Sequence, residues 1–126
     1  FCAGAGGKTL ALGALMRSTG RLYAFDVNEK RLAGLTPRMR RAGLSNVHPI
    51  AIKTERDSRV KRLTGKFDRV LVDAPCSGTG TLRRNPDLRW RMNEQELARI
   101  NAIQANVLDS CLRHLFIAQT RKPRRG

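Results

Sequence analysis

The chain of 126 residues is long enough for one domain with a hydrophobic core, and too short for two. Its hydrophobic content is 40%, and no apolar run is long enough to cross a membrane, so we expect a globular, cytoplasmic protein without a membrane partner. A formal net charge of +15 and a pI near 11.5 favour a polyanionic partner, most simply nucleic acid.

The first half of the chain predicts strands and helices in alternation. A Gly-rich loop at 4–7 precedes a short helix over 8–17, and the apolar run 21–26 is typical of a buried strand that ends on an acid. Asn28 is placed to cap the next helix, and Pro37 is expected to break that helix or to begin a second one.

The second half continues this alternation. Gly43 is a candidate helix C-cap, 46–52 a third strand, 55–63 a short polar helix and 67–72 a fourth strand. The clearest amphipathic helix of the chain follows over 93–115, and it begins with the capping box Asn-x-x-Glu.

Strands that alternate with helices predict an α/β fold with a parallel, doubly wound sheet. In such a sheet the strand that leads into the Gly-rich loop has neighbours on both sides, and here it would lie before Phe1. The chain also begins without Met, so we expect an upstream portion to be missing. The stretch 116–126 is basic and has no clear periodicity, and we expect it to be a tail after a domain at 1–115.

Three widely spaced cysteines, Cys2, Cys76 and Cys111, are present. Without a C-x-x-C pair, they predict neither a zinc site nor a disulfide framework, which agrees with a reducing cytosol. We expect no metal cofactor and a monomeric protein. Cys111 falls on the apolar face of the last helix and is therefore expected to be a core residue.

The segment Cys2-Ala3-Gly4-Ala5-Gly6-Gly7-Lys8-Thr9 is a Gly-rich loop that leads into a helix, which allows close approach of a nucleotide-like ligand. It is similar to a P-loop in its Gly-Lys-Thr end, but Cys2 stands where the first Gly of that motif belongs. Asp26 lies about 20 residues further on, at the end of the next strand, where an acid can accept hydrogen bonds from ribose hydroxyls. A Gly-rich turn without a ligand is the alternative.

A second loop, Asp73-Ala74-Pro75-Cys76-Ser77-Gly78-Thr79-Gly80, follows the fourth predicted strand. Ligands of open α/β sheets bind beyond the carboxyl ends of the strands, so Asp73 and Cys76 are candidate catalytic residues. Nearby positive charge makes a thiol more reactive, and an arginine pair follows shortly in the sequence. An unreactive loop cysteine is the alternative.

Together, the two loops, Asp26 and the sequence Arg83-Arg84-Asn85-Pro86-Asp87 resemble the Sun/Fmu-type RNA (cytosine-5) methyltransferases over roughly residues 2–115. The resemblance implies a partial class I methyltransferase sheet of the Rossmann type, with its first strand and last strands missing. It implies S-adenosylmethionine as cofactor and RNA as partner, with methylation of carbon 5 of a cytosine in ribosomal RNA.

By that resemblance, a set of loop residues and acids lines the cofactor. The set is Cys2, Ala3, Gly4, Ala5, Gly6, Gly7, Lys8, Asp26, Asp57 and Asp73. Asp57 would sit near the adenine, with Glu55 as a competitor, and Asp73 would lie between the cofactor and the target base. The arginines expected to bind RNA are Arg83, Arg84 and Arg89.

The chain departs from the family pattern at the nucleophile. In the family a second Cys, in a Thr-Cys-Ser segment on a later strand, attacks the base, and the loop Cys matched by Cys76 assists product release. This chain contains no Thr-Cys dipeptide. We therefore expect it to be inactive in isolation, either as part of a larger catalytic domain or because its reading frame is altered near position 116.

Three alternatives stay open. Cys76 could itself attack the cytosine, as the Pro-Cys loop does in DNA cytosine methyltransferases. The chain could be an RNA-binding module without activity, which explains the charge but not the Gly-rich loop together with Asp26. A P-loop nucleotide hydrolase is disfavoured by Cys2.

Overall fold

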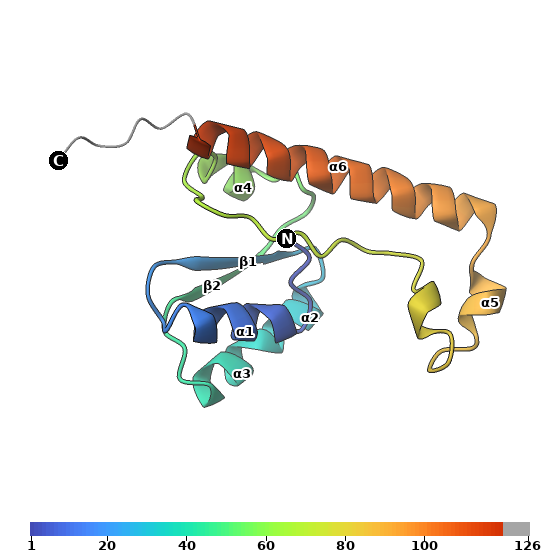
Figure 1. Ribbon diagram of the computed structural model, residues 1–126, viewed down its shortest axis with the longest axis horizontal. Helices are drawn as coiled ribbons and strands as arrows, with labels where there is room; N and C mark the ends of the chain where they lie inside the picture. Colours follow the sequence, from blue (N-terminus) through green and yellow to red (C-terminus); the bar gives the residue numbers. More distant parts are fainter. Residues whose placement is uncertain (120–126) are drawn as a thin grey trace.

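The computed structural model describes the backbone of residues 1–119 and the side chains of residues 1–113 (Figure 1). Helices and strands alternate in the first half of the chain, as predicted, and a long helix closes the described part. In chain order the elements are α1 (Gly7–Leu15), β1 (Leu22–Asp26), α2 (Glu29–Ala33), α3 (Leu35–Arg41), β2 (Val47–Ala51), α4 (Ser58–Arg62), η1 (Thr79–Thr81), α5 (Leu88–Arg91) and α6 (Glu94–Gln119).

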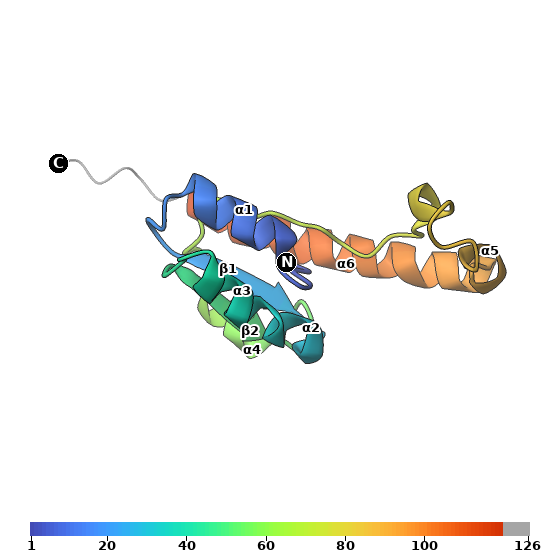
Figure 2. The same ribbon diagram turned by 90° about the horizontal axis from the view of Figure 1, so that it is seen from below.

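Strands β1 and β2 form a parallel pair, in which Leu22 lies opposite Val47 and Asp26 opposite Ala51. Helices α1, α2 and α3 lie on one side of this pair, and α4 and α6 lie on the other (Figures 1 and 2). The buried residues of the two hydrophobic clusters are Ala24, Leu32, Leu35 and Val47 in one and Phe25, Ile52 and Val60 in the other. The chain is therefore α/β, with a parallel sheet and flanking helices, consistent with part of a Rossmann-like fold.

The helix boundaries follow from a few side chains. Asn28 and Asn93 each accept, through the side-chain oxygen, the N–H three residues later, at 3.0 and 2.8 Å, so both predicted caps are confirmed. The second short helix begins at Leu35, and Pro37 lies in its first turn, where a missing N–H costs no helical hydrogen bond. Gly43 follows this helix with a φ of +67°, as expected after a C-cap.

The fourth strand predicted at 67–72 is wrong, because this segment is irregular and belongs to no sheet. A groove of about 1070 Å³ is lined by residues 66–71, by residues of β1 and by residues of α1. Phe1 reaches across one end: its amino group donates to the carbonyl of Leu71 at 2.8 Å, and the N–H of Asp73 donates to the carbonyl of Phe1 at 3.3 Å. The apolar pattern of 67–72 is typical of a strand, but a strand also needs a hydrogen-bonding neighbour along its whole length.

Helix α6 confirms the clearest amphipathic pattern of the sequence. Its buried face carries Ile100, Val107 and Cys111. The hydroxyl of Ser110 donates to the carbonyl of Glu55 at 2.9 Å, which fastens the helix to the segment before α4.

Helix α6 continues to Gln119, past the end of the domain predicted at 115. That boundary stays a prediction, and most of the predicted tail, residues 120–126, lies outside the described residues. Within the described residues, no helix combines the length and the apolarity needed to cross a bilayer.

Candidate active site

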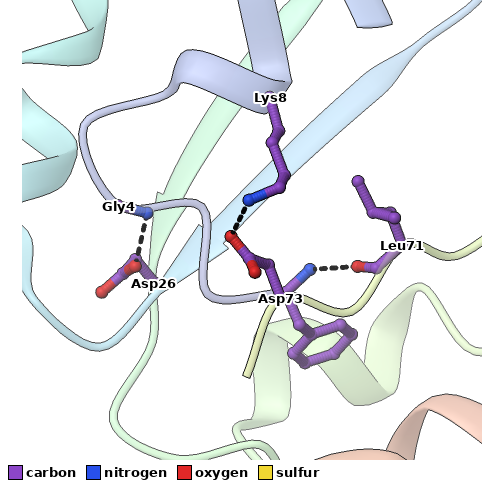
Figure 3. A network of polar contacts seen from close by, with 6 residues as sticks. Gly4, Lys8, Asp26, Leu71 and Asp73 are labelled. Carbon is purple, nitrogen blue, oxygen red and sulfur yellow. Dashed lines mark hydrogen bonds and ion pairs between the residues drawn. The ribbon is translucent and has the colours of Figure 1, made fainter. Parts of the chain in front are cut away.

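The two loops singled out in the sequence lie beside each other beyond the end of β1 (Figure 3). Nζ of Lys8 is 2.6 Å from Oδ2 of Asp73, which joins the Gly-rich segment to the second loop. The N–H of Gly4 donates to Oδ2 of Asp26 at 2.7 Å. The fold therefore brings Asp26, Asp73 and the loop of residues 2–8 to one place.

Left-handed backbone gives the Gly-rich loop its shape. The φ angles are +60° at Cys2, +57° at Gly4 and +91° at Gly6. At Gly6 an added Cβ would also lie 2.2 Å from Cδ1 of Leu35 in α3, so both conformation and space require glycine there. Helix α1 starts directly after Gly6 without a side-chain cap, so its first N–H groups lack an intrahelical partner and face the loop.

Asp26 fixes this loop to the end of β1. The side chain is buried, and its other oxygen, Oδ1, accepts the N–H of Asn28 at 2.7 Å. Nearby, the N–H of Ala3 donates to the carbonyl of Phe25 at 2.9 Å, which adds a second attachment. Because each carboxylate oxygen accepts more than one hydrogen bond, Asp26 keeps acceptor capacity for a ligand.

Arg38 holds the loop from α3, and no pattern in the sequence marks it. Its Nη1 donates to the carbonyl of Ala5 at 2.6 Å. In the sequence Arg38 stands in a basic stretch with Arg40 and Arg41, where it counts as surface charge. The two residues are 33 positions apart in the sequence, so only the tertiary fold reveals this contact.

The Lys8–Asp73 ion pair is open to solvent. The two side chains are 65% and 51% exposed, so the pair contributes less than about 1 kcal/mol to stability. Its effect is to orient the carboxylate: Lys8 holds the side chain of Asp73, while Phe1 accepts a hydrogen bond from its main chain. An oriented, accessible carboxylate beside a Gly-rich loop is suited to contact a bound substrate.

The three thiols have different environments. Cys76 is exposed, on the loop after Asp73, whereas Cys2 is half-buried in the Gly-rich loop, where burial raises the pKa of its thiol. Cys111 is 2% exposed, and burial raises its pKa to about 11. Cys111 is therefore a core residue, as predicted, and Cys76 is the thiol most open to a substrate among the described side chains.

The second loop runs on along α6, away from the sheet. Nε2 of Gln104 in α6 donates to the carbonyl of Pro75 at 2.6 Å. Helix α5, which contains Arg89, lies at the end of α6 that is remote from the sheet (Figure 1). Arg83 and Arg84 line a hollow of about 620 Å³. Arg83, Arg84 and Arg89 therefore lie further from the sheet than the Lys8–Asp73 ion pair does.

Asp57 has a clear structural role. Its carboxylate accepts the N–H of Lys53 and the N–H of Arg59, each at 2.9 Å, and caps α4. These backbone hydrogen bonds lower the pKa of Asp57. Its predicted contact with adenine, and the competing one of Glu55, stay predictions. Within the described residues, no group of three or more His, Cys, Asp or Glu side chains could hold a metal ion.

Comparison with protein families matches residues 1–122 to the model for 16S rRNA methyltransferase RsmB/F. A curated relative, the 28S rRNA (cytosine(4447)-C(5))-methyltransferase of Homo sapiens, is 36% identical over 113 residues, which cover 89% of this chain and 13% of the relative. The ribosomal RNA small subunit methyltransferase B of Citrobacter koseri is 34% identical over 118 residues, which cover 91% of this chain and 26% of the relative.

A solved structure, the crystal structure of PH0851, has a similar fold, with a TM-score of 0.81 and 36% sequence identity. The match covers 89% of this chain and 25% of that chain. The chain thus spans about a quarter of the length of two of these relatives and 13% of the human one.

Proposed function

Since the chain belongs to the 16S rRNA methyltransferase RsmB/F family, we propose that it forms part of a catalytic domain that methylates carbon 5 of a cytosine in ribosomal RNA. The human relative is named for this modification of 28S rRNA, and the bacterial relative for methylation of small-subunit ribosomal RNA. The observation that carries the proposal is the Lys8–Asp73 ion pair, because it joins a cofactor-type loop to the loop that holds an exposed thiol.

The proposed cofactor is S-adenosylmethionine, which supplies an electrophilic methyl group when bound. The Gly-rich loop fits such a ligand, because the space beside Gly4 is open and the first N–H groups of α1 face the loop. Asp26 retains acceptor positions that suit ribose hydroxyls. Residues 2–8, Asp26 and Asp73 would hold the cofactor, and Asp57 would approach its adenine.

The reaction needs a carboxylate and a thiol. Carbon 5 of cytosine is a poor nucleophile, and a thiolate that adds to carbon 6 makes carbon 5 electron-rich enough to take a methyl group. A base then removes the proton from carbon 5, and the thiolate leaves as the ring double bond returns. Asp73, oriented by Lys8, is placed to hydrogen-bond the ring and to favour the adduct. The target base must leave its stack to reach Asp73.

Cys76 has two candidate roles. The family pattern makes it the release residue, while the burial of Cys111 leaves Cys76 as the exposed thiol for attack among the described side chains. Cys76→Ala separates the two roles. If Cys76 assists release, the Cys76→Ala variant of the complete enzyme, which supplies the attacking thiol, accumulates a covalent RNA adduct, seen as a slow band on a denaturing gel. If Cys76 attacks, wild type forms the adduct and the variant does not. A complete protein that forms no adduct with or without Cys76 is an RNA-binding module without activity.

Calorimetric titration of S-adenosylmethionine and of ATP tests the proposed cofactor. We expect saturable binding of S-adenosylmethionine that Asp26→Ala weakens, because the variant removes the acceptor for the ribose and releases Gly4. Asp68→Ala, which removes an exposed acid outside the two loops, is the matched control. Saturable binding of ATP without any response to S-adenosylmethionine would overturn the proposal.

A further inference from the structure

The only tryptophan of the chain, Trp90, is 89% exposed. It lies in α5, on the stretch that connects the second loop to α6. An exposed tryptophan offers a large apolar face with a polar N–H at its edge, the combination that is enriched where a partner covers the surface.

The phase of α5 explains why the ring points outward. Leu88 packs back against Gly78, where an added Cβ would lie 3.3 Å from its Cδ1. Two residues further along a helix the side chain points to nearly the opposite side, which is the position of Trp90. The N–H of Trp90 donates to the carbonyl of Asp87 at 3.1 Å, and the N–H of Met92 donates to that of Leu88 at 3.0 Å. The ring of Trp90 is therefore exposed on a hydrogen-bonded turn. Leu88, and not Trp90, packs this turn against the rest of the chain.

The charge around Trp90 defines the class of ligand. Between residues 78 and 92 the chain carries four arginines and a single acid, Asp87. Arg91 is paired with that acid, whereas Arg83, Arg84 and Arg89 are exposed and have no ion pair within the described residues. An apolar protein partner would have to bury these guanidinium groups. A nucleic acid suits the same surface, because its phosphates pair with arginine and its bases stack on an aromatic face.

The position of α5 defines which part of the nucleic acid it meets. Figures 1 and 2 show α5 at the end of α6 that is remote from the sheet, whereas the second loop meets α6 further on, where Gln104 donates to the carbonyl of Pro75. A base at Trp90 is therefore a different nucleotide from the one at Asp73 and Cys76. An aromatic side chain stacks on a base whose face is free, so the strand must be unpaired there.

We infer that Trp90 is a stacking site for a nucleobase of single-stranded RNA that flanks the target, with Arg83, Arg84 and Arg89 on its phosphates. The inference rests on the proposed RNA substrate and deepens it. It assigns Trp90 to substrate binding and leaves the methyl transfer to Asp73 and Cys76 in the second loop.

The fluorescence of the intact chain reports on Trp90 alone, because no other tryptophan is present. The probe is a single-stranded oligoribonucleotide of about 12 nucleotides, within the usual range of site sizes for such proteins. We expect saturable quenching of the tryptophan emission by this probe, and weaker quenching by a duplex of the same length.

Affinity is measured separately, by the anisotropy of a labelled copy of the probe. Trp90→Ala is expected to weaken binding about tenfold and Trp90→Phe much less, since one base–aromatic stack contributes about 1–3 kcal/mol. Arg84→Ala is expected to reduce the slope of log affinity against log salt by about one, while Trp90→Ala leaves that slope unchanged. Leu15→Ala is the control, because it removes an 81% exposed apolar side chain from α1.

Two results would overturn the inference. If the probe binds but neither quenches Trp90 nor distinguishes Trp90→Ala from wild type, Trp90 is not a stacking site, and the proposed RNA substrate stands. If no RNA binds while S-adenosylmethionine does, the stacking site and the RNA substrate both fail, and the cofactor assignment remains.

Discussion

Lys8 and Asp73 are 65 positions apart in the sequence, and their side chains meet at 2.6 Å beyond the end of β1. The contact joins the Gly-rich loop to the second loop at a solvent-accessible position. Its geometry is more informative than its energy, because an exposed ion pair contributes little to stability.

In the complete enzyme, Asp73→Ala is expected to abolish methyl transfer from labelled S-adenosylmethionine to ribosomal RNA fragments, because it removes the carboxylate proposed to contact the target base. The melting temperature should change little, since the side chain is 51% exposed. Asp109→Ala is a matched control: Asp109 is 50% exposed and also paired with an arginine, on α6 outside the site. Methyl transfer that survives in Asp73→Ala would remove Asp73 from the mechanism.

Gly6→Ala is expected to destabilise the fold by about 1–3 kcal/mol, measured by urea denaturation. The variant combines a φ of +91° with a Cβ placed 2.2 Å from Leu35, which is fully buried. Gly7→Ala is the adjacent control, because its Cβ meets nothing within 4 Å and Ala favours a helix. Equal stability of the two variants would show that the loop can move off α3.

Arg38→Met is expected to weaken binding of S-adenosylmethionine about fivefold, because the carbonyl of Ala5 loses a hydrogen bond from a charged group, a loss of about 1 kcal/mol. Calorimetry measures the effect. Arg40→Met removes an exposed charge from the same helix and should leave the affinity unchanged. A similar loss in both variants would point to general electrostatic attraction.

Much of this arrangement can be predicted from local sequence. Asn28 and Asn93 mark helix starts through contacts three residues away, and Asp26 follows from a strand pattern and its distance to the Gly-rich loop. The structure of segment 67–72 cannot be predicted in this way, because a strand needs a neighbouring strand to pair with, and the residues of the segment itself do not show whether one is present. The role of Arg38 cannot be predicted for a related reason. The arginines around it have the same chemistry, and only the fold places Arg38 at the carbonyl of Ala5.

Alkylation at mildly alkaline pH should modify the cysteines in the order of their exposure. Cys76 should react first and Cys2 more slowly, since burial raises the pKa of Cys2. Cys111, with a pKa of about 11, should stay protonated and unmodified until the protein unfolds.

The same burial makes stability depend on pH. A thiol with a raised pKa stabilises the folded state fully below its unfolded pKa of 9.0, and this contribution is lost as the pH rises toward about 11. Mass spectrometry of digests measures the alkylation, and denaturation at a series of pH values measures the stability. Early modification of Cys111 in the folded chain would contradict its place in the core.

The hydrogen bonds of Phe1 have a consequence for the position of Asp73. The backbone nitrogen of Phe1 donates to the carbonyl of Leu71, and the carbonyl of Phe1 accepts from the N–H of Asp73, so the residue before the Gly-rich loop is bonded to the segment that leads into the second loop. A change in the backbone around Phe1 would therefore shift Asp73, the carboxylate proposed to act in catalysis.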